Sequence, residues 1–579
     1  MELRDYIIQR DRTTLGFNVD FRWTVKSALY LRTLFSEFED QEFRTGAEIP
    51  FGDGSLNEGL SATSRAIIEA TPDDPIEVVR ELKDRLETQS IYSVVTGGDV
   101  FFGPWTLEAQ AAYSSAEEIE DDAPYSVFAQ EFERGQFGLD SSNGEKPRLF
   151  FDDAATSAAW EDADAYAFEE FELVNGDASD QEVSAKSTSN TTFPCAVTRA
   201  FLRPAQASGS GIRRTSSTGH SLSSMAIGLY QSFWAVWIIR WGRLARPSVK
   251  APRAGFFDAN HDQLEINEID SAIDSNIEDY EVEEGVIAGY VMHNLEFDTL
   301  RVVYGVRVEQ TDFDAGGKQV DLVEEGAEVD GVVFAEDTVL VSRLSADDSY
   351  TDVLPSINLR DNFQENLIGR AAYYSSIARP NPEHVAPFVA VERVPGETAG
   401  EADNPDLDRA RADNLDVSLA YYPNRDSVLA AGIFYKQIEN FIGLQVFENA
   451  ERNGVLFDEI ETVVNLDDAD LLGFEIDYRQ ALTGLPGILS GLLIGANDTY
   501  VDSEVDLPSG RTIPVPGQSE NVANLIVGFE QGPVDLRLAL TYRDRFLDGI
   551  DEGGDGIDRY AQASPSLWVW CMPRLCQCV

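Results

Sequence analysis

Apolar and polar residues alternate with a period of two along most of this chain, and this constrains the fold more than any other feature. Successive side chains of a β-strand point to opposite faces, so each alternating segment predicts a strand with one apolar face. The clearest segments are 15–23, 105–113, 300–308, 415–421, 474–478 and 534–542. We therefore expect an all-β protein.

The polar face of these predicted strands carries full charges. They include Arg301, Arg307, Arg537 and Arg543. A water-filled lumen accommodates such charges better than a second packed layer does, so we expect these arginines to face a lumen and to pair with carboxylates of neighbouring strands. The apolar face often ends in an aromatic residue, as in the interfacial girdle of membrane strands, at Trp23, Trp105, Tyr113, Tyr421 and Tyr542. Together these features indicate a large transmembrane antiparallel β-barrel.

The connections between predicted strands fall into two sizes. Residues 423–426 and 530–533 have turn chemistry, whereas residues 117–124, 312–348 and 380–413 are predicted to be long loops rich in carboxylates. Short turns at one end and long loops at the other are typical of outer-membrane barrels. A large soluble sandwich or propeller is the alternative, although no repeat of blade length is present.

The charge balance excludes one broad class of function. The 579 residues contain 44 Lys+Arg and 102 Asp+Glu, a net charge of −58, which is unsuitable for binding nucleic acid. Hydrophobic residues make up 43%, too much for a disordered acidic tail. The acidic loops could steer cationic or metal-chelating ligands to the barrel mouth. As the simpler interpretation, we take them to be a solvated exterior.

Several segments resemble the barrel of TonB-dependent outer-membrane receptors. The most specific is the run from Asn404 to Pro423, which reads NPDLDRARADNLDVSLAYYP. Residues 350–359 and 370–380 are similar to the two strands that precede this run in the family. The likeness covers residues 1–182 and 258–558, which we interpret as the first and second parts of the barrel.

The resemblance implies a barrel of about 22 strands in the cell outer membrane, plugged by an N-terminal domain. It also implies TonB-dependent uptake of a scarce nutrient, such as a siderophore or a saccharide, with TonB and outer-membrane lipid as partners. Because Met1 already stands in barrel-like sequence, we expect no signal peptide, plug or TonB box. The expectation is therefore an incomplete barrel, a fragment not competent for energised transport.

Two segments differ abruptly in composition from the rest. Residues 183–257 contain no Asp or Glu but ten Lys+Arg, and residues 559–579 contain no acid either. All four cysteines, Cys195, Cys571, Cys576 and Cys578, lie in these two segments. The segments could be a lipid-facing or partner-binding insert or a low-complexity linker. Our preferred hypothesis is out-of-frame translation of a strand-coding region.

No residue is nominated as catalytic, cofactor-binding or metal-binding, and substrate-binding residues stay unassigned. His220, His261, His293 and His384 lack the spacing of metal ligands, and the three C-terminal cysteines fit a misread tail better than a soft-metal site. Residues 258–262 begin like a calcium loop, but Gln263 and Ile269 stand where glycine and the bidentate glutamate are needed. Residues 553–558 predict a turn. We expect no enzyme.

Two other classes of function are alternatives to the receptor. A secreted or surface-attached soluble β-rich protein could act as an adhesion or binding module, and it would fold in water without detergent. An outer-membrane hydrolase would need a nucleophile with a positioned base, and no such pair can be named from the sequence.

Overall fold

The computed structural model describes most of the chain. The described residues are 2–24, 27–51, 54–57, 59–61, 64–103, 105–142, 148–151, 153–194, 199–205, 211–222, 266–277, 279–329, 331–507, 510–532, 534–549, 559–561 and 563–573. Cys195, Cys576, Cys578, His261 and residues 258–262 and 553–558 lie outside these ranges.

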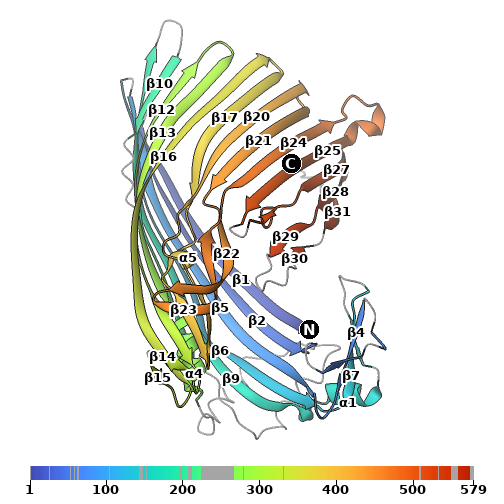
Figure 1. Cartoon of the computed structure of the whole chain (residues 1–579). Helices are drawn as coiled ribbons and strands as arrows, with labels where there is room; N and C mark the ends of the chain where they lie inside the picture. The colour runs from blue at the N-terminus through green and yellow to red at the C-terminus, as the bar shows by residue number, and fades with distance from the viewer. Residues whose placement is uncertain are drawn as a thin grey trace.

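One sheet of 23 strands dominates the protein and curves into a wall (Figure 1). Its long strands pair antiparallel with their neighbours along the chain. They are β1 (Glu2–Thr24), β2 (Ser27–Glu48), β5 (Ile76–Phe102), β6 (Trp105–Phe132), β9 (Ala167–Pro194), β10 (Arg199–Ala205), β11 (Gly211–Leu222), β12 (Tyr280–Glu296), β13 (Leu300–Val323), β16 (Thr338–Gln364), β17 (Leu367–Ala378), β20 (Ala410–Asn424), β21 (Ser427–Glu439), β24 (Ala469–Ala481), β25 (Leu492–Asp506), β27 (Asn521–Gln531), β28 (Val534–Arg543) and β31 (Ser564–Pro573). β10 and β11 both lie between β9 and β12.

An apolar band runs across the outer face of this wall. In register across four strands lie Ile357, Tyr373, Leu415 and Tyr435, and the next row contains Leu359, Ala371, Val417 and Ile433. Val417 and Ile433 are about half exposed, because no protein layer covers this face. Exposed apolar side chains in consecutive rows match the lipid-facing band of a membrane barrel. The predicted all-β transmembrane barrel architecture is confirmed.

The two ends of the wall differ as the sequence predicted. β20 and β21 are joined by a short turn at 425–426, and β28 begins three residues after the end of β27. The connections at the other end contain extra elements, including β14 (Glu328–Val329), β15 (Val332–Val333) and α4 (Glu268–Ile277), at the lower end of the wall in Figure 1.

Two of the predicted long loops are wrong. Residues 117–124 lie within β6, and most of 312–348 belongs to β13 and β16, which leaves only 324–337 between the strands at this connection. Past the apolar band both faces of a strand are wet, so its sequence loses the alternation although the backbone ladder continues. Residues 380–413 do form a long connection, with α5 (Pro382–Val385), β18 (Val389–Val394), β19 (Glu397–Ala402) and the start of β20.

Short strands extend the sheet at the loop end. β18 pairs parallel with the end of β13, β19 pairs with β18, and the hairpin of β22 (Ile442–Arg452) and β23 (Val455–Asn465) continues from β19. β26 (Thr512–Ile513) pairs with β25. These strands lack the alternation of the membrane strands, so the sequence pattern did not predict them. Val389, Val391, Phe457 and Ile460 form the apolar core of this extension.

The connections between β2 and β5 and between β6 and β9 form a separate small sheet at the lower right of Figure 1. It contains β3 (Ser55–Leu56), β4 (Arg65–Ala70), β7 (Gly135–Asp140) and β8 (Arg148–Phe151), followed by α1 (Ala154–Glu161) and a 3-10 turn (Ala163–Ala165). Ile68, Ile76, Phe132 and Phe137 form its core. β29 (Phe546–Gly549) and β30 (Arg559–Ala561) form a further hairpin.

The wall has two edges within the described part of the chain. There β1 pairs only with β2, β31 pairs only with β28, and no ladder joins β1 to β31. None of the described helices is both long and apolar enough to span a bilayer.

The apolar band is interrupted at β9. Its outward positions opposite Ala111, Ala109 and Leu107 of β6 are Ala185, Ser187 and Ser189. This interruption begins where the acid-free segment 183–257 begins, and residues 223–257 of that segment lie outside the described residues. We propose that residues 183–257 and 559–579 arise from out-of-frame translation.

Sequencing of the coding DNA tests this proposal. We expect a single-base shift near Thr192 that is restored near Phe257, and another near Tyr560, to open a frame that encodes acidic, alternating residues. If no such frame exists at either segment, the proposal is wrong and the native chain has a polar stripe at β9.

A charge placed on the outer face should destabilise the protein. We expect Val417→Arg to lower the free energy of unfolding by about 2–4 kcal/mol, because an arginine near the middle of the lipid band loses its hydration. Thr499→Arg is the matched control, since Thr499 lies on the inward face opposite Glu475. Guanidinium unfolding in phospholipid vesicles measures both variants; equal losses would show that Val417 does not face lipid.

Candidate functional site

A cavity of about 300 Å³ lies on the inward face of the wall, near the loop end. In the register of β12, β13 and β16, one row of this face contains Glu284, Phe313 and Asp348. The cavity is completed by the connections that follow β17 and β19. Its lining consists of Val282, Glu284, Phe313, Asp348, Tyr350, Arg379, Pro380, Asn381, Pro382, Val385, Pro405 and Leu407.

Arg379 connects the cavity wall to two strands. It directly follows β17, and its Nε lies 2.9 Å from Oε1 of Glu284 on β12. Its Nη2 donates hydrogen bonds to Oε2 of Glu309 (2.8 Å) and Oγ1 of Thr311 (3.2 Å) on β13. One guanidinium therefore bridges two carboxylates across neighbouring strands, which holds the start of the 379–409 connection against the wall.

A second arginine lies beside Tyr350. Nε and Nη2 of Arg409 donate to Oδ1 of Asp352, at 2.9 and 2.8 Å. Asp352 is only 1% exposed, so this charge is held inside the protein by its arginine. The guanidinium of Arg409 also lies 4.6 Å from the centre of the Tyr350 ring. These contacts orient Tyr350, which presents an aromatic surface to the cavity.

The connection around α5 closes the cavity. The amide of Asn404 donates to the carbonyl of His384 (2.9 Å), which ties the end of the connection to α5. Burial, together with the charges of Glu383 and Glu401, raises the pKa of the neighbouring Asp403 to about 7. The charge state of this segment therefore changes near neutral pH.

The four arginines predicted to face the lumen do so, but only some have carboxylate partners. Arg307 pairs with Glu309 on its own strand, not across strands. Arg537 lies 3.3 Å from Asp535 of its own strand and 3.8 Å from Glu530 of β27. Arg301 and Arg543 depart from the prediction: Arg301 donates to the amide oxygen of Asn294. Arg543 donates to Oγ of Ser519 and to the carbonyl of Gly517.

The structure does not bring the histidines together. His220 belongs to β11, His293 lies on the outward side of β12 with Nδ1 2.8 Å from the Tyr304 hydroxyl, and His384 lies in α5, 3.7 Å from Glu383. Cys571 belongs to β31. Among the described residues no group of three or more His, Cys, Asp or Glu could hold a metal ion.

Sequence reasoning missed Arg379, Arg409 and Tyr350. The sequence offered a signal for the two arginines, because basic residues are outnumbered in this acidic chain. Both lie in segments that resemble the family, Arg379 directly after β17 and Arg409 directly before β20. The lining combines carboxylates, a guanidinium, two aromatic rings and prolines. Such a surface is suited to binding a small molecule with polar and apolar parts.

The Arg379 bridge should be measurable in a double-mutant cycle. We expect Arg379→Gln to destabilise the protein by about 1–3 kcal/mol, because Glu309 loses a hydrogen bond to a charged donor and Glu284 loses its ion-pair partner. Combined with Glu309→Gln, the two losses should be clearly non-additive. Guanidinium unfolding of the four proteins gives the coupling; additive losses would show that the bridge contributes nothing.

Asp403 should make stability depend on pH. The folded protein keeps the Asp403 proton to about pH 7, whereas the unfolded chain keeps it only to about pH 3.8. The favourable contribution of this carboxyl group to the free energy of unfolding is therefore complete below pH 3.8. It is lost as the pH rises through 7. Asp403→Asn should therefore raise the Tm relative to wild type more at pH 8 than at pH 5. An equal difference at both pH values would contradict the assignment, and Asp406→Asn serves as an exposed control.

Comparisons with known proteins agree with this architecture. The family model "TonB dependent receptor-like, beta-barrel" matches residues 105–570. The ferric-catecholate import receptor Fiu from E. coli K12 is 11% identical, with a TM-score of 0.52, over 100% of this chain and 75% of Fiu. The ferric enterobactin receptor PfeA from Pseudomonas aeruginosa is 10% identical, with a TM-score of 0.41, over 98% of this chain and 73% of that one. No curated protein sequence matches.

The Fiu structure supports the fold alone at this level of identity. The family match covers more than half of the chain and includes the strands that carry the cavity. Proteins of this family are transport receptors of the outer membrane, not enzymes, and they act with TonB. The chain belongs to the family of TonB-dependent receptor-like β-barrels.

Proposed function

We propose that this protein binds a small nutrient at the inward cavity beside Arg379 and Tyr350, as the first step of TonB-dependent uptake across the outer membrane. The observation that carries the proposal is the position of the cavity. It opens on the inward face, at the end where the long connections lie. In outer-membrane barrels these connections face the outside, where a nutrient arrives.

The charge of the cavity limits the ligand class. Glu284 and Asp348 line it together with one cation, Arg379, which already bridges two carboxylates. A polyanion would face uncompensated like charge, whereas a neutral or cationic ligand would not. Phe313 and Tyr350 add aromatic surface, on which a saccharide ring or the apolar part of a metal chelate can pack.

Siderophores and saccharides both fit this description, and we favour a neutral or cationic iron chelate. Fiu is described as a ferric-catecholate import receptor. An iron chelate that binds in this cavity needs less negative charge than a tris-catecholate complex. The cavity and the whole chain, with a net charge of −58, repel anions. We propose no catalytic reaction for this cavity, and the receptor needs none for binding.

Binding of ferric chelates of different charge tests the proposal. The full chain in nanodiscs of neutral lipid is titrated with cationic and neutral tris-hydroxamate complexes, a trianionic tris-catecholate complex and a neutral oligosaccharide. Quenching of intrinsic fluorescence is recorded. We expect the cationic or neutral chelate to bind at least about tenfold more tightly than the trianion.

Two variants locate the binding. Tyr350→Ala should weaken it at least about tenfold, because the ring forms part of the cavity wall. Tyr422→Ala is the matched control, since Tyr422 lies next to the short turn at the opposite end of the wall. Tightest binding of the trianion, or equal losses in both variants, would reject the proposal; tight binding of the saccharide alone would reject the iron chelate as the ligand.

A further inference from the structure

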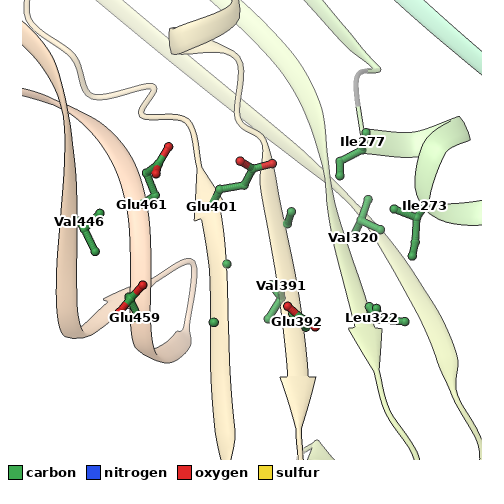
Figure 2. Close-up of a pocket in the computed structure, with 13 residues that line it drawn as sticks. Ile273, Ile277, Val320, Leu322, Val391, Glu392, Glu401, Val446, Glu459 and Glu461 are labelled. Atoms are coloured by element: carbon green, nitrogen blue, oxygen red, sulfur yellow. The ribbon is translucent and has the colours of Figure 1, made fainter. Parts of the chain in front are cut away.

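A second and larger hollow lies on the strand extension at the loop end. Its volume is about 650 Å³, and β13, β18, β19, β23 and β22 form its floor in this order, with α4 at one side (Figure 2). Its lining consists of Ile273, Ile277, Val320, Leu322, Ala390, Val391, Glu392, Ala399, Gly400, Glu401, Val446, Glu459 and Glu461. We call it the acidic groove.

The acidic groove opens on the side of the wall opposite to the candidate cavity. β13 pairs with β16 without a register shift from Leu300 to Val323, so its alternation is unbroken. Val320 and Leu322 therefore lie on the same face as the outward Val306 and Val308, whereas Phe313 of the cavity lies on the other face. Twelve residues separate Val308 from Val320, about 40 Å of strand. The groove thus lies outside the lumen and well beyond the lipid band.

The floor of the groove is apolar. Ile273 and Ile277 are four residues apart on α4, one turn of the helix, and both are only partly buried. Val320 is buried beneath them, and Leu322 and Val446 are partly exposed. A partner that covers this floor removes apolar surface from water, which is the main source of binding energy at most interfaces.

Like charges stand opposite one another across the strands of the groove. Glu401 of β19 lies in register with Glu461 of β23, and Figure 2 shows them at the same level on neighbouring strands. Glu459 lies in register with Glu448 of β22, on the same face. Like charges directly opposite destabilise a sheet, so a cation brought beside Glu459 and Glu448 would relieve a repulsion.

The nearby cations of the same strands are already engaged. Lys318 donates to Oδ1 of Asn276 (2.7 Å) and pairs with Asp279. Arg393 lies next to Glu392 in sequence, but its guanidinium contacts Oδ1 of Asp321 at 2.7 Å. Glu392, Glu401 and Glu459 are all exposed. Further positive charge for these three carboxylates would therefore come from another molecule.

We propose that the acidic groove is a docking surface for a basic, amphipathic peptide segment of a partner protein outside the cell. Apolar side chains of the segment cover Ile273, Ile277 and Leu322, and its lysines or arginines meet Glu392, Glu401 and Glu459. Because the groove lies on the outer face, this binding is separate from nutrient binding in the lumen.

Fluorescence anisotropy tests the proposal with a defined probe. The full chain in nanodiscs of neutral lipid is titrated with a short fluorescein-labelled peptide of alternating Lys and Leu, and with a Glu/Leu peptide of the same length. Glu392→Gln/Glu401→Gln/Glu459→Gln should weaken binding of the Lys/Leu peptide at least about tenfold, since three exposed ion pairs are lost. Ile273→Ser, on the partly exposed helix, should also weaken it.

Matched controls separate docking from general attraction to an acidic protein. Glu336→Gln/Glu397→Gln/Glu451→Gln removes the same number of exposed carboxylates outside the groove and should change affinity less than about twofold. An equal loss in both triple variants would overturn the proposal, as would equal binding of the Glu/Leu peptide. Circular dichroism of each variant confirms that the wall is folded.

Discussion

The structure depends on the backbone hydrogen bond in lipid. A peptide group in the hydrocarbon region has no water to bind, so each strand there needs a ladder on both sides. The long strands from β2 to β28 meet this need by pairing on both sides, without a register shift between β13 and β16, whereas within the described residues β1 and β31 each have one ladder. Side chains are sorted as a result: every second residue faces lipid, and the residues between face inward.

Ion pairs then fix the positions of the long connections on the inward face of the wall. Arg379 joins β12, β13 and the connection after β17, and Arg409 holds the buried Asp352. A buried charge without its partner is costly, so each of these arginines specifies where a long connection must sit. The cavity beside Tyr350 is thus a product of charge pairing at the end of the strands, not of a large apolar core.

The sequence predicted the membrane part of the fold well and the external part poorly. Within the band, one face of each strand meets lipid. Leu415, Val417 and Leu419 therefore alternate strictly with polar residues. Residues 117–124 are also part of a strand. Because water lies on both of its faces, apolar and polar residues do not alternate there. The hairpins β18–β19 and β22–β23 pair parallel with strands far away in sequence, which local periodicity cannot reveal. Arg379 and Arg409 were visible as charges, but their partners are set by register and tertiary pairing.

The length of the strands has a consequence for how the protein reaches its membrane. β5 and β6 have 27 and 28 residues, far more than the roughly ten that span a bilayer. Their carboxylate-rich ends must cross the hydrocarbon before the apolar band comes to rest, and each charge would cost several kcal/mol in contact with lipid. Spontaneous insertion strand by strand is therefore a poor route. The chain has to be carried across as a largely paired sheet, through a path that keeps these ends hydrated.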